Sequence, residues 1–242
     1  MRVSFNQPAF IPWGGFYGRL LHSDLMILLD RTQFTRGFTF VNRNRLKGPQ
    51  GEIWVTVPIR KKRLGLQKIN QLRLARAESW GYKFLSLLRH YYGHSPYYEQ
   101  TIADLGRILK EAGDNFLRLA VQTSGLLADY FGLRTPFRLQ SELGLELKGT
   151  ELLVELALRV GASEVLLPYL ADRHLNLEAF KRAGLKVIYL KYDQVPYPQF
   201  WGHFIENLSA VDLWLCCGPE GLRNIKRSSR LLLAAAKDFS ES

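Results

Sequence analysis

The stretch from Val3 to Asp30, VSFNQPAFIPWGGFYGRLLHSDLMILLD, contains two short apolar runs separated by a segment rich in glycine and proline. The runs Val3–Phe5 and Leu25–Leu29 have the composition of buried strands, and each ends at polar residues. Gly15–His22, between them, is predicted to form a short helix. A strand, a helix and a second strand in this order predict an α/β fold with a mostly parallel sheet.

Polar side chains follow both predicted strands. Asn6, Gln7 and Pro8 follow the first strand, Asp30 ends the second, and Gln33 lies shortly after it. Ligands of parallel α/β sheets bind at the carboxyl ends of the strands, so these residues are candidates for a binding site. Asp30 is the candidate base, because a carboxylate can accept a proton.

The segment Gln7–Gly15 combines two prolines, two glycines and two aromatic residues, one of which is Trp13. Prolines fix the path of a turn, and glycines let the backbone approach a ligand closely. The segment is interpreted either as a ligand-binding turn or as a well-packed structural turn.

The middle of the chain changes from strands to helices. Ile53–Ile59 and Ile69–Leu74 are expected to pair as strands around the basic loop Arg60–Arg63. From about Glu78 to Phe131 the apolar residues recur at helical spacing. Breaks in this helical segment are predicted at Gly93–Pro96 and at Ala112–Asp114.

The last third of the chain returns to alternating helices and strands. Helices are predicted at Thr150–Val160 and Leu177–Ala183, and strands at Glu164–Leu167 and Leu185–Tyr192. A final helix from about Leu222 to Lys237 would carry basic residues on one face. These are Arg223, Lys226, Arg227 and Arg230.

These elements predict one α/β domain over residues 1–242. It would comprise a basic strand-rich unit (1–76), a helical segment (77–135), an α/β return (136–220) and a basic C-terminal helix (221–242). No fixed-period repeat and no linker stand out in the sequence.

The positive charge is concentrated at one end of the chain. Of its 242 residues, the first 76 carry 14 Lys and Arg against 3 Asp and Glu, while the rest balance at 19 against 19. An excess of one sign in one segment indicates an anion-binding surface. We therefore expect a phosphate-containing small-molecule ligand.

Composition also bears on the compartment. The two cysteines, Cys216 and Cys217, are neighbours and form no disulfide framework, which favours a reducing environment. No apolar stretch has the length of a signal peptide or a membrane span. A cytoplasmic protein is expected.

The densest polar motif is Asn42-Arg43-Asn44-Arg45-Leu46-Lys47. Its cations and amides suit phosphate or carboxylate oxygens, whether the motif forms a helix or a loop. The ordinary alternative is a solvated basic face. Arg60 and Lys61 add two further cations.

Nucleic acid is a less favoured partner. The basic loop at Arg60–Arg63 could neutralise phosphates and nearby aromatic residues could stack on bases, but no RNP, KH or zinc-finger motif is present. No metal site is predicted, because His90 and His94 stand four residues apart without a third ligand. No cofactor is predicted.

A series of short motifs runs through most of the sequence. The first are Gln7-Pro8, Pro12-Trp13, Gly15, Leu29-Asp30, Gln33-Phe34, Asn42-Arg43-Asn44, Lys47, Trp54 and Val57-Pro58. The later ones are Trp80, Tyr92, Pro96-Tyr97-Tyr98, Ser141-Glu142-Leu143, Pro196-Tyr197-Pro198-Gln199, Leu208-Ser209, Asp212-Leu213 and Gly218-Pro219. In order and spacing, over about residues 2–220, this series resembles the WbqC-like family of bacterial and archaeal proteins.

The resemblance implies a role in surface-polysaccharide (O-antigen) biosynthesis. It suggests transfer of an acyl or aminoacyl group, such as glycyl, to a nucleotide-activated amino sugar. The sequence departs from the family pattern at Asn6 and Phe84, where relatives commonly have histidine, and at Leu167-Pro168, where many have Ser-Gly. Neither Asn nor Phe transfers protons near neutral pH, so either the chemistry of the family does not depend on these histidines, or this member has altered or lost it.

A weaker likeness is architectural. The first strand, polar turn, helix and second strand resemble the Rossmann-like opening of nucleotidyltransferase and pantoate-ligase folds, which hold a nucleotide against the first turn. Their His-x-x-His motif is missing here, so no residue role is transferred.

The leading hypothesis assigns the candidate residues to three roles. Asp30 is the base, and Asn6 occupies the second catalytic position. Phosphate binding is assigned to Arg43, Lys47, Arg60 and Lys61, and orientation of the acceptor to Gln7, Gln33, Asn42 and Asn44, with Pro8, Trp13, Tyr197 and Gln199 completing the site. The alternatives are a noncatalytic nucleotide-sugar or RNA binding protein descended from such an enzyme, and a basic protein with a structural role.

Overall fold

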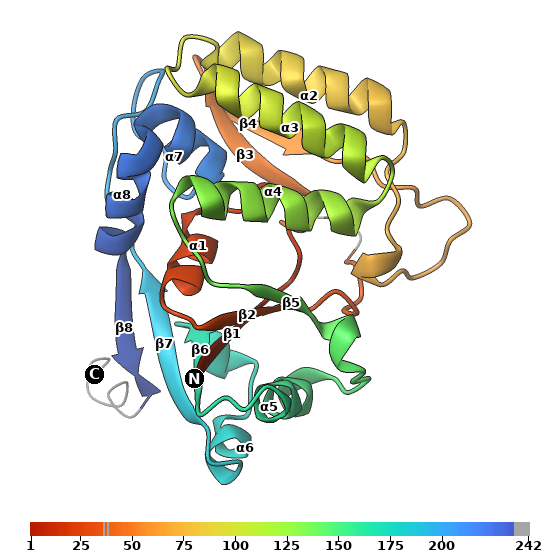
Figure 1. Ribbon diagram of the computed structural model, residues 1–242, viewed down its shortest axis with the longest axis vertical. Coiled ribbons are helices and arrows are strands. Elements are labelled where there is room, and N and C mark those ends of the chain that lie inside the picture. Colours follow the sequence, from red (N-terminus) through yellow and green to blue (C-terminus); the bar gives the residue numbers. More distant parts are fainter. Residues whose placement is uncertain (36, 38, 235–242) are drawn as a thin grey trace.

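The structure is a computed structural model that describes residues 1–35, 37 and 39–234. At its centre is a six-stranded sheet (Figure 1). Its strands run in the order β5-β2-β1-β6-β7-β8. The first five are parallel, and β8 is antiparallel to β7. Their bounds are β1 (Arg2–Asn6), β2 (Leu25–Leu28), β5 (Phe137–Leu139), β6 (Glu164–Pro168), β7 (Lys186–Tyr192) and β8 (Ser229–Leu233). The predicted α/β class is confirmed.

The strand order reverses beside β1. The chain passes from β1 to β2 and then to β5 on one side, and later returns to β6 on the other side of β1. Ser4 of β1 accordingly pairs with Met26 of β2 and with Leu166 of β6. In open α/β sheets such a reversal leaves a crevice at the carboxyl ends of the two diverging strands.

Helices cover both faces of the sheet. Successive residues of β1 point to opposite faces, so Val3 and Phe5 pack in one core and Ser4 and Asn6 point toward the other. The first of these cores contains α5 (Gly149–Arg159) and α6 (Leu177–Arg182). The opposite face is covered by α1 (Gly14–Leu21), against which α8 (Gly221–Ser228) packs.

A hairpin and three long helices extend the core above α1 (Figure 1). The predicted helical segment forms three helices, and the predicted breaks separate them. The elements are β3 (Arg43–Gly48), β4 (Gly51–Thr56), α2 (Ala77–Tyr92), α3 (Tyr98–Ala112), α4 (Phe116–Tyr130) and, later in the chain, α7 (Ala210–Cys217). Short 3-10 turns lie at Ile69–Gln71, Gln140–Leu143, Ala171–Arg173 and Gly218–Glu220.

The predicted C-terminal helix is wrong beyond Ser228. The helix ends there, and Ser229–Leu233 instead forms β8, so Arg230 lies on a strand. The pairing satisfies hydrogen-bonding groups along the edge of β7, a gain that helical periodicity in the sequence does not reveal. The end of the predicted helix, residues 235–237, lies outside the described residues.

The basic motif beginning at Asn42 is a strand, neither a helix nor a loop. It forms most of β3 and pairs with β4 from Arg43–Thr56 to Gly48–Gly51. The expected pairing of Ile53–Ile59 with Ile69–Leu74 is limited to a bridge between Ile59 and Leu74, flanked by backbone hydrogen bonds. The first part of that segment, Ile53–Thr56, instead belongs to β4 and pairs with β3, because a two-residue turn joins these two strands directly.

No helix in the described parts of the chain is both long and apolar enough to cross a membrane.

Candidate functional site

A pocket of about 440 Å³ lies at the carboxyl ends of β1 and β6, where the strand order reverses. We call it the strand-end pocket. Its wall comes from the ends of the strands, the turn after β1, the segment before β3 and the loop after β6. The lining includes Asn6, Gln7, Trp13, Thr39, Phe40, Asn44, Leu167, Pro168 and His174. Four sequence-predicted residues, Asn6, Gln7, Trp13 and Asn44, are thus brought together.

Asn6 is the last residue of β1 and lines the pocket. Its Nδ2 donates to the Gln7 carbonyl at 2.7 Å, and its Oδ1 accepts a hydrogen bond from the guanidinium of Arg19. Gln7 is exposed and donates through Nε2 to the Thr32 hydroxyl at 3.2 Å. Pro8 is buried and is not among the residues that line the pocket. The end of β1 therefore presents amides, and no carboxylate, to the pocket.

The turn after β1 is held from behind by the β3 strand. Ile11 has a positive φ of 40°, and its carbonyl accepts from Asn44 Nδ2 and from the Ser209 hydroxyl, each at 2.7 Å. Asn42 donates to the Val57 carbonyl at 2.8 Å. Both asparagines are buried. Their amides stabilise the backbone that shapes the pocket, and only Asn44 lines it.

Two exposed aromatic residues adjoin the pocket, and of these Phe40 is among the lining residues whereas Trp54 is not. Phe40 is 46% exposed, and its ring lies 5.8 Å from that of Trp54 on β4. The guanidinium of Arg43 lies 5.1 Å from the centroid of the Trp54 ring. On the inner wall, Trp13 makes an edge contact with Tyr192 at 5.1 Å. Phe40 and Trp54, which we call the aromatic mouth of the pocket, thus offer flat apolar surfaces bordered by a cation.

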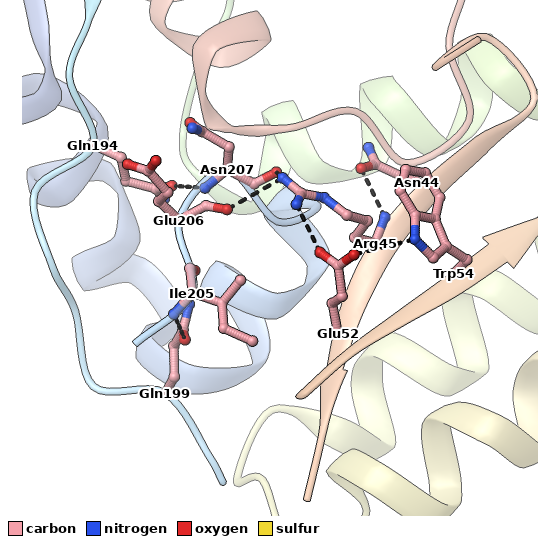
Figure 2. A network of polar contacts seen from close by, with 9 residues as sticks. All are labelled: Asn44, Arg45, Glu52, Trp54, Gln194, Gln199, Ile205, Glu206 and Asn207. Atoms are coloured by element: carbon pink, nitrogen blue, oxygen red, sulfur yellow. Dashed lines mark hydrogen bonds and ion pairs between the residues drawn. The ribbon is translucent and has the colours of Figure 1, made fainter. Parts of the chain in front are cut away.

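Arg45 joins the hairpin to the loop before α7 (Figure 2). Its guanidinium donates to the Glu52 carboxylate at 2.7 Å and to the carbonyl groups of Glu206 and Asn207 at 3.3 and 3.1 Å. In the same loop, the Gln199 side chain pairs with the backbone of Ile205 in both directions, at 2.8 and 2.9 Å (Figure 2). These contacts fix a loop that the chain reaches only after α6 and β7.

Lys47 points into the interior. Its Nζ donates to Gln199 Oε1 at 2.9 Å and to the carbonyl of His203. Nearby, the buried Asp212 carboxylate accepts from the hydroxyls of Tyr92 and Tyr197, both at 2.6 Å. Burial raises the pKa of Asp212, while hydrogen bonds from the two tyrosines and the charge of Lys47 oppose that rise. Lys47, Tyr197 and Gln199 therefore belong to a buried network, which we call the Asp212 network.

Asp30 is fully buried beside the 3-10 turn Gln140–Leu143 and is not among the residues that line the strand-end pocket, although its neighbour Leu29 is. Its carboxylate accepts from the Ser141 N–H at 2.9 Å and from Asn70 Nδ2 at 3.2 Å. Gln33 lines a separate cleft with Arg31 and Lys68. The structure does not bring these two predicted residues to the pocket.

Arg60 and Lys61 line another cleft, with Arg73. Arg60 pairs with Asp114 at 3.1 Å, and the Lys61 ammonium lies 5.7 Å from the centroid of the Phe34 ring. Neither residue is part of the strand-end pocket lining. Their assignment to phosphate binding stays a prediction for a different surface.

Sequence reasoning missed the pocket residue Phe40, and it also missed His174. His174 lies in the loop after β6, is exposed, and is the titratable side chain among those that line the pocket. No motif marks it in the sequence, since it reaches the pocket only because β6 lies beside β1.

Phe84, where relatives commonly have histidine, packs in the core against Phe10 and Trp80, with ring centroids 5.3 and 5.5 Å away. A histidine at position 84 would lie in that aromatic cluster.

No group of three or more His, Cys, Asp or Glu suited to a metal occurs among the residues that the structure describes. Cys216 and Cys217 are free and half-buried on α7, and burial raises the pKa of both thiols. The arrangement is therefore that of a pocket rich in amides and aromatic side chains, with one histidine.

The fold and pocket define an α/β protein with a pocket at the reversal point of a mostly parallel sheet. The chain belongs to the WbqC-like protein family, whose model matches residues 7–224. It is 29% identical over 223 residues to Uncharacterized protein Rv1507c of Mycobacterium tuberculosis, covering 90% of this chain and 95% of that protein. No solved structure matches.

Proposed function

We propose that this protein is a cytoplasmic transferase of surface-polysaccharide biosynthesis that binds a nucleotide-activated amino sugar in the strand-end pocket. It would transfer an acyl or aminoacyl group, of the glycyl type, to the sugar amine. The position of the pocket carries the proposal: it lies where parallel α/β folds bind nucleotides and presents amides and aromatic rings. Membership in the WbqC-like family supports it.

The pocket suits such a ligand in size and chemistry. Its volume of about 440 Å³ lies within the range of small-molecule sites. The amides of Asn6 and Gln7 can donate to and accept from sugar hydroxyls. Phe40 and Trp54 at the mouth offer faces on which a base or a sugar ring can stack, and Arg43 beside Trp54 can approach a phosphate.

His174 takes the role of the base in this proposal, in place of Asp30. In acyl transfer, the amine nitrogen attacks the acyl carbon, a new C–N bond forms and the bond to the leaving group breaks. The amine proton passes to the imidazole, which then returns it to the leaving group. His174 lines the pocket, whereas Asp30 is held by Ser141 and Asn70.

Replacing Phe40 with alanine should weaken the binding of nucleotide sugars by about 10- to 100-fold, because base stacking on an aromatic ring contributes about 1–3 kcal/mol. Isothermal titration calorimetry with a panel of nucleotide sugars measures the effect. Tyr82→Ala removes an exposed aromatic ring on α2, away from the pocket, and should leave binding unchanged. Equal affinities for wild type and Phe40→Ala would exclude the aromatic mouth as part of the site.

Replacing His174 with glutamine should lower kcat by at least about 100-fold with little change in sugar affinity, since general base catalysis contributes roughly 10²–10⁴. Single-turnover acylation of the sugar, followed by mass spectrometry, gives the rate. The control His90→Gln changes an exposed histidine on α2 that is remote in sequence from the pocket elements. A fully active His174→Gln enzyme would rule out His174 as the base.

Noncatalytic binding of a nucleotide sugar or RNA is the second candidate function. The observation that favours it is Asn6 at the end of β1, an amide that cannot transfer protons near neutral pH. It predicts a ligand complex without turnover in the single-turnover assay. RNA binding would weaken steeply with salt, because phosphate contacts release counterions, whereas binding of one nucleotide sugar would depend on salt far less.

A further inference from the structure

Arg19 is a buried cation on α1, only 7% exposed. Its one side-chain hydrogen-bond partner in the described part of the chain is Asn6 Oδ1, a neutral amide oxygen. Among the described residues, no carboxylate lies within ion-pairing distance of it, and its Nε has no hydrogen-bond partner. Burial lowers the pKa of Arg19 to about 10, so the guanidinium is still charged at neutral pH. A buried charge without a counter-ion is unfavourable, which makes this position unusual.

The position of Arg19 connects it to the strand-end pocket. Asn6 lines that pocket, so the guanidinium lies one hydrogen bond behind the wall. Ser4 precedes Asn6 by two residues on β1 and points to the same face of the sheet. Its hydroxyl is fully buried and also has no partner among the described residues. On the side of β1 that faces α1, the side chains of Arg19 and Ser4 therefore both have a hydrogen-bond donor without a partner among the described residues.

We propose that Arg19 is the anion-binding group of the strand-end pocket, and that an oxyanion of the ligand binds beside Asn6 and pairs with the guanidinium. The oxyanion is a phosphate or a carboxylate, since a planar guanidinium can donate two parallel hydrogen bonds to either. This inference deepens the proposed function and rests on the strand-end pocket being its ligand site. It assigns the binding of the anion to the interior Arg19 and not to the exposed Arg60 and Lys61.

The test compares thermal unfolding of wild type, Arg19→Met and Arg223→Met with inorganic phosphate or acetate, each against sodium chloride at equal ionic strength. Wild type should be stabilised by one of the two anions, and which one identifies the oxyanion as a phosphate or a carboxylate. Arg19→Met should bind that anion about 10- to 100-fold more weakly. Arg223, exposed on α8 and paired with Glu220, is the control whose variant should respond like wild type.

Arg19→Met also makes a second prediction, because it removes an unpaired buried charge. Without added anion its Tm should exceed that of wild type by about 2 °C or more. A structural arginine would give the opposite sign. A lower Tm for Arg19→Met, an unchanged anion response in that variant, or the absence of any anion response in wild type would overturn the inference.

Asn6→Asp tests the same inference without removing Arg19. The new carboxylate would pair with the guanidinium inside the protein, raise the Tm and abolish the anion response. An unaltered response in Asn6→Asp would contradict the inference.

If nucleotide sugars bind to Arg19→Met as tightly as to wild type but weakly to Phe40→Ala, the proposed function stands and the Arg19 site fails. If the anion response requires Arg19 but no nucleotide sugar binds, the Arg19 site stands and the proposed function fails.

Discussion

Replacing Asp212 with alanine should lower the free energy of unfolding by about 3–5 kcal/mol. The carboxylate is fully buried and accepts hydrogen bonds from the hydroxyls of Tyr92 and Tyr197. Without it, both hydroxyls lose their acceptor, and Lys47 loses the carboxylate whose pKa it helps to lower. Each buried group left without its partner costs about 1–3 kcal/mol.

Equilibrium unfolding in urea measures this effect, with Asp193→Ala as the matched control. Asp193 is exposed and forms surface ion pairs with Lys191 and Arg230 at 3.6 and 3.8 Å. Exposed pairs contribute about 0–1 kcal/mol, so the control should unfold close to wild type. A similar small loss in Asp212→Ala would mean that the Asp212 network does not stabilise the fold.

Replacing Gly218 with alanine should also be strongly destabilising, for two separable reasons. Gly218 has φ 54° and ψ −137°, a backbone conformation that only glycine adopts without strain of about 1–3 kcal/mol. In addition, a Cβ at this position would lie 2.0 Å from Cζ of Tyr97, inside the ring's contact distance. Displacing that ring from a packed core adds about 1–3 kcal/mol.

Gly113→Ala measures the cost of backbone strain separately from the cost of displacing the Tyr97 ring. Gly113 ends α3 with φ 55° and ψ −120°, close to the conformation of Gly218, but a Cβ there would meet no atom within 4 Å. This control should show the backbone strain alone, and the difference between the two variants should equal the cost of moving Tyr97. Equal losses of stability, measured by urea unfolding, would show that the Tyr97 ring yields without cost.

The excess of positive charge in the first 76 residues is partly offset by ion pairs in the folded chain. Several cations of the first 76 residues pair with acids that lie much later. Arg60 and Arg73 both contact Asp114, and Arg31 and Lys68 both contact Glu146. These four cations share two carboxylates, so part of the apparent surplus is offset across the tertiary structure. Composition counts charges along the chain, whereas ion pairing depends on which residues become neighbours in space.

Local patterns were sufficient to predict most elements. The helices α2, α3, α4, α5 and α6, and the strands β1, β2, β6 and β7, match apolar periodicities and breaks that lie within short windows of sequence. The C-terminal strand β8 was missed because its conformation depends on pairing with β7. β-Structure is more sensitive to such context than helix is, since the backbone hydrogen bonds of a strand are made to another segment, whereas those of a helix are local.

The sequence by itself therefore determined the α/β class, the helical middle, the family and the amides at the end of β1. Only the tertiary structure decided which candidate residues meet. It brought Asn6, Asn44 and His174 to one pocket, and buried Lys47 in the Asp212 network. It also left the Arg19 charge in the interior with an amide as its partner. The reason is physical: secondary structure follows from neighbours in sequence, but burial, ion pairing and pocket chemistry follow from contacts between distant segments.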